Sequence, residues 1–258
     1  MVSYFNQVPI YYSIIGKGPS LVLLHGFLLS ATIWDELAPK LSKKNKVIII
    51  DLPGHGESGC LAKVHTMELM AEVVNFILEE NNIDQVSFIG HSMGGYISLA
   101  FAEKYRSKIN TLILLNSSSE EDTPERKIKR DSAIKIIKHH NDVFIKMGIA
   151  ALFPEDTHKK FQNYIGKLVD EAKSIKTESI IAAIRGMKNR KDRTPVLASF
   201  EGNKFIIAGI EDPLIPFSNS EKNSFESQTK LFKVGTGHMS VKENIEEIIN
   251  IMRLIGYI

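Results

Sequence analysis

The stretch that most constrains the fold of this chain is Val86–Ala102, VSFIGHSMGGYISLAFA. An apolar run leads into Gly90-His91-Ser92-Met93-Gly94, and a helical pattern follows. This matches G-x-S-x-G, in which a serine takes a strained turn between a buried strand and a helix and stands exposed at its tip. The flanking glycines let strand and helix pass closely, because they carry no side chain. The pattern predicts a nucleophile elbow with Ser92 as the nucleophile.

Apolar runs and helical patterns alternate around the elbow. The runs Ser3–Phe5 and Ile10–Ile15 predict an opening antiparallel hairpin. Continuous apolar runs, typical of strands that are buried on both faces, lie at Leu21–Leu24, Val47–Ile50 and Thr111–Leu115. Helices are predicted over Ala31–Leu41, capped by Ser30 and with Trp34, Leu37 and Leu41 on the buried face, and over Met67–Glu80. This alternation predicts βαβ units and a largely parallel sheet.

The character of the sequence changes between Ser117 and Phe200, where no strand pattern occurs. Amphipathic helices are predicted near Pro124–His139, Asp142–Leu152, His158–Ala172 and Thr177–Lys188. Strand patterns return at Lys204–Ala208 and Lys230–Val234, and a helix over Asn244–Ile255 follows. We therefore expect a core formed by residues 1–116 and 201–258, interrupted by a helical cap over 117–200.

Composition excludes several classes of partner. The 32 basic and 30 acidic residues nearly balance, so neither nucleic acid nor a membrane surface is expected as a partner. The single cysteine, Cys60, permits no internal disulfide, and no Cys/His cluster has zinc-ligand spacing, so no metal is expected. The N-terminus lacks the basic and apolar regions of a signal peptide, and no apolar run is long enough to span a bilayer. We expect a cytoplasmic protein. It is expected to be a monomer or a homodimer, and the sequence does not distinguish the two.

A serine nucleophile needs a histidine that takes its proton and a carboxylate that orients the histidine. Asp212 follows the strand and glycine KFIIAG, and His238 follows the strand that ends at Val234. Both therefore lie where predicted strands end, as Ser92 does. Glu211 is a second candidate for the acid. His25, His55 and His91 are expected to have structural roles.

Acyl transfer also needs donors for the oxyanion of the tetrahedral intermediate. The backbone N–H of Met93, directly after the nucleophile, is one predicted donor, and the N–H of Phe27, in the loop after Leu24, is the other. The side chains of Phe27 and Met93 are predicted to line the acyl pocket. Between Glu120 and Arg193 the cap holds 17 Lys and Arg against 12 Asp and Glu, so Arg185 or Arg193 could face the pocket and favour substrates that carry a carboxylate.

Five segments together resemble the α/β-hydrolase family: HGF at 25–27, DLPGHGES at 51–58, GHSMGG at 90–95, GIEDPLIP at 209–216 and GHMS at 237–240. The resemblance implies an eight-stranded, mostly parallel sheet with helices on both faces, a helical cap, and hydrolysis without a cofactor. It also implies the chain order Ser92, Asp212, His238 for the triad, with Asp212 rather than Glu211 at the family's spacing from Gly209 and Pro216. Dehalogenases and epoxide hydrolases of similar shape use an aspartate at the elbow, which Ser92 argues against.

Among the serine members, the chain is most similar to small cytoplasmic carboxylesterases and enol-lactonases, and its segment RGMKNRKDRTPVLASF at 185–200 resembles lactonase-like sequences. The expected function is hydrolysis of a small to medium carboxylic ester or lactone through an acyl-enzyme. A C–C bond hydrolase, a thioesterase or a perhydrolase-type protein would use the same motifs, because the shape of the pocket distinguishes them. A catalytically silent binding module on the same fold is a further alternative, although such a module usually lacks a member of the triad.

Overall fold

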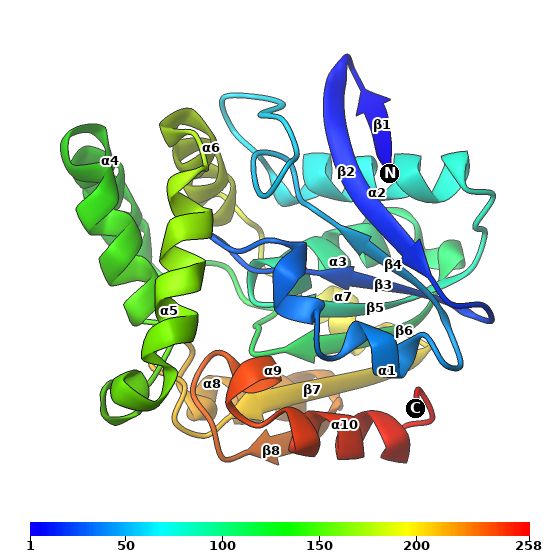
Figure 1. Ribbon diagram of the computed structural model, residues 1–258. Coiled ribbons are helices and arrows are strands. Elements are labelled where there is room, and N and C mark those ends of the chain that lie inside the picture. Colours follow the sequence, from blue (N-terminus) through cyan, green and yellow to red (C-terminus); the bar gives the residue numbers. More distant parts are fainter.

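One sheet of eight strands runs through the protein in the order β1-β2-β4-β3-β5-β6-β7-β8 (Figure 1). The computed structural model describes residues 1–258. The strands are β1 (Val2–Phe5), β2 (Val8–Ile15), β3 (Ser20–Leu24), β4 (Lys46–Ile50), β5 (Val86–His91), β6 (Ile109–Leu115), β7 (Asn203–Gly209) and β8 (Lys230–Val234). β2 is antiparallel to both of its neighbours, and all pairs from β4 to β8 are parallel. The predicted eight-stranded, mostly parallel sheet is confirmed.

The antiparallel edge begins with the predicted hairpin. β1 and β2 are joined by Asn6 and Gln7, whose φ angles are 48° and 65°. Positive φ at both positions is the mark of a type I′ turn, whose twist matches that of the flanking strands. β2 then pairs with β4, which places the hairpin beside the parallel strands.

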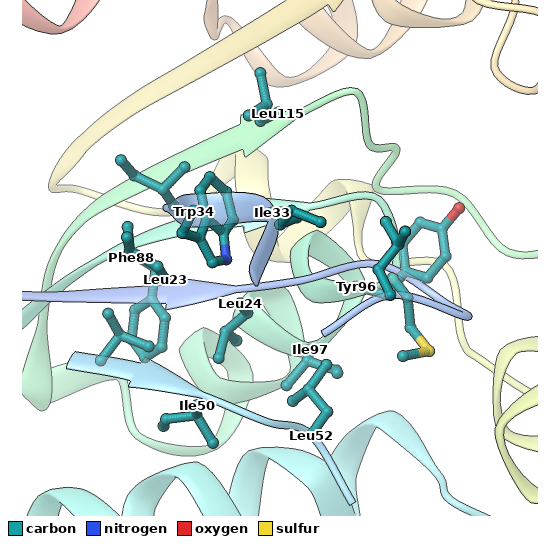
Figure 2. Close-up of a cluster of buried hydrophobic side chains, with 14 of the residues drawn as sticks. Leu23, Leu24, Ile33, Trp34, Ile50, Leu52, Phe88, Tyr96, Ile97 and Leu115 are labelled. Carbon is teal, nitrogen blue, oxygen red and sulfur yellow. The ribbon is translucent and has the colours of Figure 1, made fainter. Parts of the chain in front are cut away.

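The central strands are buried because helices cover both faces of the sheet. One layer consists of α2 (Met67–Glu80), α3 (Met93–Lys104), α7 (Thr194–Ala198) and α8 (Phe217–Ser227), which contact one another in that order. The other layer holds the 3₁₀-helix η1 (Ala31–Trp34), α1 (Ala38–Leu41), α9 (Ser240–Glu243) and α10 (Ile245–Leu254) (Figure 1). Figure 2 shows the core where Leu23 and Leu24 of β3 meet Phe88 of β5 and Trp34 of η1. These four side chains have no exposed surface.

The helix predicted over Ala31–Leu41 is wrong as a single element. The chain forms η1, then a turn, and only then α1. Pro39 lies in the first turn of α1, where its missing N–H costs nothing, but a continuous helix would place its ring against the preceding turn. The predicted buried face is nevertheless correct, since Trp34, Leu37 and Leu41 have no exposed surface.

The segment between β6 and β7 contains helices and no strand, as expected. Its helices α4 (Pro124–Ala150), α5 (His158–Lys173) and α6 (Thr177–Lys188) stand together at one end of the sheet (Figure 1). α4 combines two predicted helices, and its backbone is non-helical at His140, where we expected the break. The short 3₁₀-helices η2 (Arg106–Lys108) and η3 (Glu155–Thr157) precede β6 and α5. The division into core and cap stays a prediction; below, "cap helices" means α4, α5 and α6.

Three α-helices were not predicted from the sequence, α7, α8 and α9. In α8 the buried residues are Ser220, Asn223 and Ser227, so this helix turns small polar side chains inward and shows no apolar period. α7 has only five residues and packs on α3 and α8. None of the helices combines the length and the apolar character needed to cross a membrane.

Candidate active site

Ser92 lies at the tip of a strained turn between β5 and α3. Its φ and ψ are 51° and −116°, outside the regions that non-glycine residues favour. It is the one residue between Val86 and Ala102 that is not buried. A Cβ at Gly94 would lie 2.3 Å from the carbonyl oxygen of Leu24, and one at Gly90 would lie 2.6 Å from the backbone of Gly94. Only glycine fits at both positions, which explains the spacing of the motif.

Asp212 lies three residues after the end of β7 and points at His238. Its Oδ2 accepts a hydrogen bond from His238 Nδ1 at 2.7 Å, and its Oδ1 accepts from the backbone N–H groups of Leu214 and Ile215 at 2.8 and 2.9 Å. Burial alone would raise the pKa of Asp212, but His238 and the two backbone donors outweigh it and lower the pKa. The carboxyl is therefore held ionised. Glu211, the other candidate acid, is exposed and makes no hydrogen bond to His238.

The second ring nitrogen of His238 is buried and unpaired. The bond from Nδ1 to Asp212 leaves the proton on Nδ1, and Nε2 has no hydrogen-bond partner in the chain. Ser92 and His238 line the same cavity. The structure thus brings the three predicted triad residues to one edge of the sheet.

The loop that carries His238 is fixed through its backbone. The carbonyl oxygen of His238 accepts a bond from His91 Nε2 at 2.9 Å, and its N–H donates to the carbonyl of Leu152 at 3.1 Å. The two oxygens of Glu243 accept from the N–H groups of Gly237 and Met239, both at 3.0 Å. Glu243 therefore holds the backbone on both sides of His238 with the two oxygens of one carboxylate.

His91 and Glu243, which hold this loop, both have perturbed pKa values. Burial, followed by the nearby charge of His238, lowers the pKa of His91 to about 3, so its ring stays neutral and can donate from Nε2 alone. Burial raises the pKa of Glu243, an effect only partly offset by the N–H bonds from Gly237 and Met239. The loop is thus held by one neutral ring and one carboxylate.

Asn116 connects the acid to the histidine loop. It follows β6 with a φ of 46°, and its Nδ2 donates at 3.1 Å both to Asp212 Oδ2 and to the carbonyl of Gly237. Sequence reasoning missed Asn116 and Glu243 as parts of the site, and Leu152 as a contact. The position of Asn116 at the end of a central strand was the one available signal, because strand ends at this edge carry the other site residues.

The predicted oxyanion donors lie beside Ser92. Met93 is the first residue of α3, so its N–H has no acceptor one turn earlier in the helix. The N–H of Phe27, in the loop after β3, makes no hydrogen bond within the chain. The side chains differ: Phe27 lines the cavity, whereas Met93 is fully buried and does not. The prediction that the Met93 side chain lines the pocket is therefore not matched by the geometry.

His25 and His55 lie behind the site and connect loops. The Nε2 of His25 accepts from the N–H of Leu52 at 3.0 Å, and the Nδ1 of His55 donates to the carbonyl of Pro53 at 3.2 Å. Neither residue lines the cavity. No group of three or more His, Cys, Asp or Glu side chains is placed to hold a metal ion.

The cavity has a volume of about 290 Å³ and lies between the sheet edge and the cap helices. Most of its lining is apolar, and its lining side chains include three cations and no carboxylate. The lining residues are Phe27, Leu28, Ser92, Tyr96, Arg126, Lys129, Arg130, Ala133, Phe144, Gly148, Ala151, Leu152, Ile184, Met187, Leu214, Ile215 and His238. Arg185 and Arg193 are absent from this set. Arg193 instead bonds Glu68 and Glu103 at 2.6 and 2.9 Å, and Arg185 donates to the carbonyl of Lys63.

Comparison with known proteins identifies the fold. The family model described as the alpha/beta hydrolase fold matches residues 19–135. A putative non-heme haloperoxidase of Mycobacterium phage D29 is 28% identical over 216 residues, which cover 80% of this chain and 76% of the relative. A thermophilic esterase from Thermogutta terrifontis superposes with a TM-score of 0.90 at 28% identity, over 96% of this chain and 93% of the other.

An enol-lactonase from Burkholderia xenovorans LB400 also has a TM-score of 0.90, at 19% identity, over 100% of this chain and 99% of the other. At that identity the likeness concerns the fold. Four findings indicate the same fold: the sheet order, the elbow after β5, the matched family model and the superpositions. The chain has the α/β-hydrolase fold.

Proposed function

We propose that the protein is a serine hydrolase that cleaves a small to medium carboxylic ester or lactone through an acyl-enzyme. One observation carries the proposal: His238 is bonded to Asp212 through Nδ1, its Nε2 has no partner in the chain, and the residue lines the same cavity as Ser92. A serine, a neutral imidazole and an oriented carboxylate are the groups that nucleophilic acyl transfer requires.

In the proposed reaction, Ser92 Oγ attacks the carbonyl carbon while His238 Nε2 takes the hydroxyl proton. Asp212 stabilises the resulting imidazolium, and the N–H groups of Phe27 and Met93 donate to the oxyanion of the tetrahedral intermediate. The intermediate collapses as His238 gives the proton to the departing alkoxide. A water then attacks the acyl-enzyme with His238 as the base, which releases the acid and restores Ser92.

The cavity and the relatives support an ester or lactone as the substrate. A volume of about 290 Å³ with mostly apolar walls suits a small acyl group. The relatives include an esterase at 28% identity. Thioesters and C–C bonds remain alternative targets of the same triad, and the cytoplasmic location and the lack of a cofactor stay predictions.

Replacement of the nucleophile tests the proposal. Ser92→Ala is expected to lower kcat for p-nitrophenyl butyrate by at least about 10³-fold, because no other group can form the acyl-enzyme. A fluorophosphonate should label Ser92 alone, as read by peptide mass spectrometry. Ser174→Ala, at an exposed cap serine, is the matched control and should change neither result. Labelling of another residue, or wild-type turnover by Ser92→Ala, would refute the proposal.

A further inference from the structure

The first turns of α4 bring an uncompensated positive charge to the cavity. Arg126, Lys129 and Arg130 all line it, and no Asp or Glu does. Residues three and four apart share one face of a helix, so the three side chains leave α4 in the same direction. Ser92 and His238 line the same cavity.

Arg126 is the best placed of the three cations. It is half-buried, and its Nη2 donates to the carbonyl of Leu214 at 2.6 Å. Leu214 in turn donates its N–H to Asp212, so Arg126 is held against the loop that carries the acid. No carboxylate lies within ion-pair distance of Arg126, and a guanidinium has five N–H donors, of which this bond uses one.

The other two cations differ in their partners. Arg130 is bonded to the buried Asp122 at 2.7 Å, and the same carboxylate binds the buried Arg190 at 2.5 Å. Asp122 is therefore already shared by two guanidinium groups. Lys129 has no ion pair or hydrogen bond and lies exposed beside Arg126. Arg126 and Lys129 are thus two cations without an ion pair, and both line a cavity with mostly apolar walls.

We infer that Arg126 and Lys129 form a subsite for a carboxylate, so that the preferred substrates are esters or lactones that also carry a free carboxylate. A guanidinium edge matches the two oxygens of one carboxylate, and the bond is stronger beside apolar walls than in water. The buried charge of Arg193, by contrast, is neutralised by Glu68 and Glu103. This inference rests on the proposed function for the reaction and adds to it a class of substrate.

The test compares two esters of similar length, the mono-4-nitrophenyl ester of adipic acid and 4-nitrophenyl hexanoate. The measured quantity is the ratio of their kcat/KM values, carboxylated over neutral. Arg126→Gln is expected to lower this ratio about tenfold, since a hydrogen-bonded charge pair is lost. Arg126→Gln with Lys129→Gln should lower it further. Arg185→Gln removes an equal charge outside the cavity and should leave the ratio unchanged.

Binding to the Ser92→Ala protein separates failure of this inference from failure of the proposed function. Calorimetry with monomethyl adipate needs no turnover, and Arg126→Gln in that background should weaken binding about tenfold. Equal ratios and equal binding with and without Arg126 would overturn the subsite while leaving Ser92-dependent hydrolysis intact. Ester turnover that survives Ser92→Ala would instead refute the proposed function, and the binding experiment would still decide the subsite.

Discussion

The two walls of the cavity are held in different ways. On the sheet side, backbone hydrogen bonds fix the loop around His238 to His91, Leu152 and Glu243. On the cap side, α4 buries only Ile137, Ile145 and Ile149 among its 27 residues. The outer face of α4 leaves Ile128, Ile136, Val143 and Met147 exposed. The cap wall thus depends on fewer buried contacts than the sheet wall.

This difference indicates that the sheet side positions the catalytic groups, whereas the cap side selects the substrate. Acyl transfer needs the histidine, its acid and the serine in one fixed geometry, which a network of hydrogen bonds provides. A wall made of helix side chains can change its shape and charge without moving those groups. We therefore expect substitutions on the sheet side to change kcat and those on the cap side to change stability or substrate preference.

The largest effect should come from the acid. Asp212→Asn is expected to lower kcat by about 10³- to 10⁴-fold, because the amide no longer stabilises the imidazolium and favours the wrong tautomer of His238. Glu211→Gln, at the exposed neighbour, should stay within about twofold. Both are measured with one ester under identical conditions. Loss of activity by Glu211→Gln but not by Asp212→Asn would reverse the assignment.

On the cap side, the buried ion pair between Arg190 and Asp122 should matter most for stability. It joins the residues just before α4 to those just after α6, and both side chains are almost fully buried. Arg190→Ala should lower the free energy of unfolding by about 3 kcal/mol, because Asp122 keeps only Arg130 as a partner. Lys104→Ala, which removes an exposed pair with Glu72, should cost less than about 1 kcal/mol. Urea denaturation of both variants measures the difference; equal losses would contradict the role of the buried pair.

Acid should destabilise the protein through buried histidines that do not line the cavity. Burial lowers the pKa of His55 and His91 to about 3 and that of His65 to about 4. In the unfolded chain these groups titrate near pH 6.5, so between about pH 6.5 and 4 the unfolded state binds more protons than the folded one. The free energy of unfolding should therefore fall as pH falls, by up to about 1.4 kcal/mol per pH unit for each histidine.

Urea denaturation between pH 7.5 and 4.5 measures this slope. His55→Asn should make it shallower by about one proton, whereas replacement of the exposed His139 in α4 should leave it unchanged. A slope that is unaffected by His55→Asn would show that this histidine does not stay neutral in the folded protein.

The smallest predicted effect concerns the hydrogen bonds of Glu243 to the backbone on both sides of His238. In Glu243→Gln one of the two backbone donors, at Gly237 or Met239, loses its acceptor and the other keeps only a neutral one, so the histidine loop is held less well. We expect kcat to fall about fivefold to tenfold, with little change in KM, because substrate does not contact Glu243. Glu247→Gln, in the first turn of α10 and bonded to Asn244, is the control. A change in KM alone would place the role of Glu243 in binding.

Local patterns were enough to predict most of the fold. Strands that are buried on both faces are mostly apolar, so β3, β4, β5 and β6 are visible in the sequence. The patterns failed in α8, where polar side chains are buried, and at Pro39, which interrupts a helix with a regular apolar spacing. Only the packing of distant segments decides such cases.

The sequence by itself determined the elbow, because Gly90, Ser92 and Gly94 are required by local geometry at one turn. It also indicated Asp212 and His238, because residues at the ends of parallel strands must meet at one edge of the sheet. It could not determine that Arg126 rather than Arg185 faces the cavity, nor that Glu243 holds the histidine loop. Those contacts join helix side chains to loops far away in sequence, and their direction depends on how the helices pack, which no local pattern records.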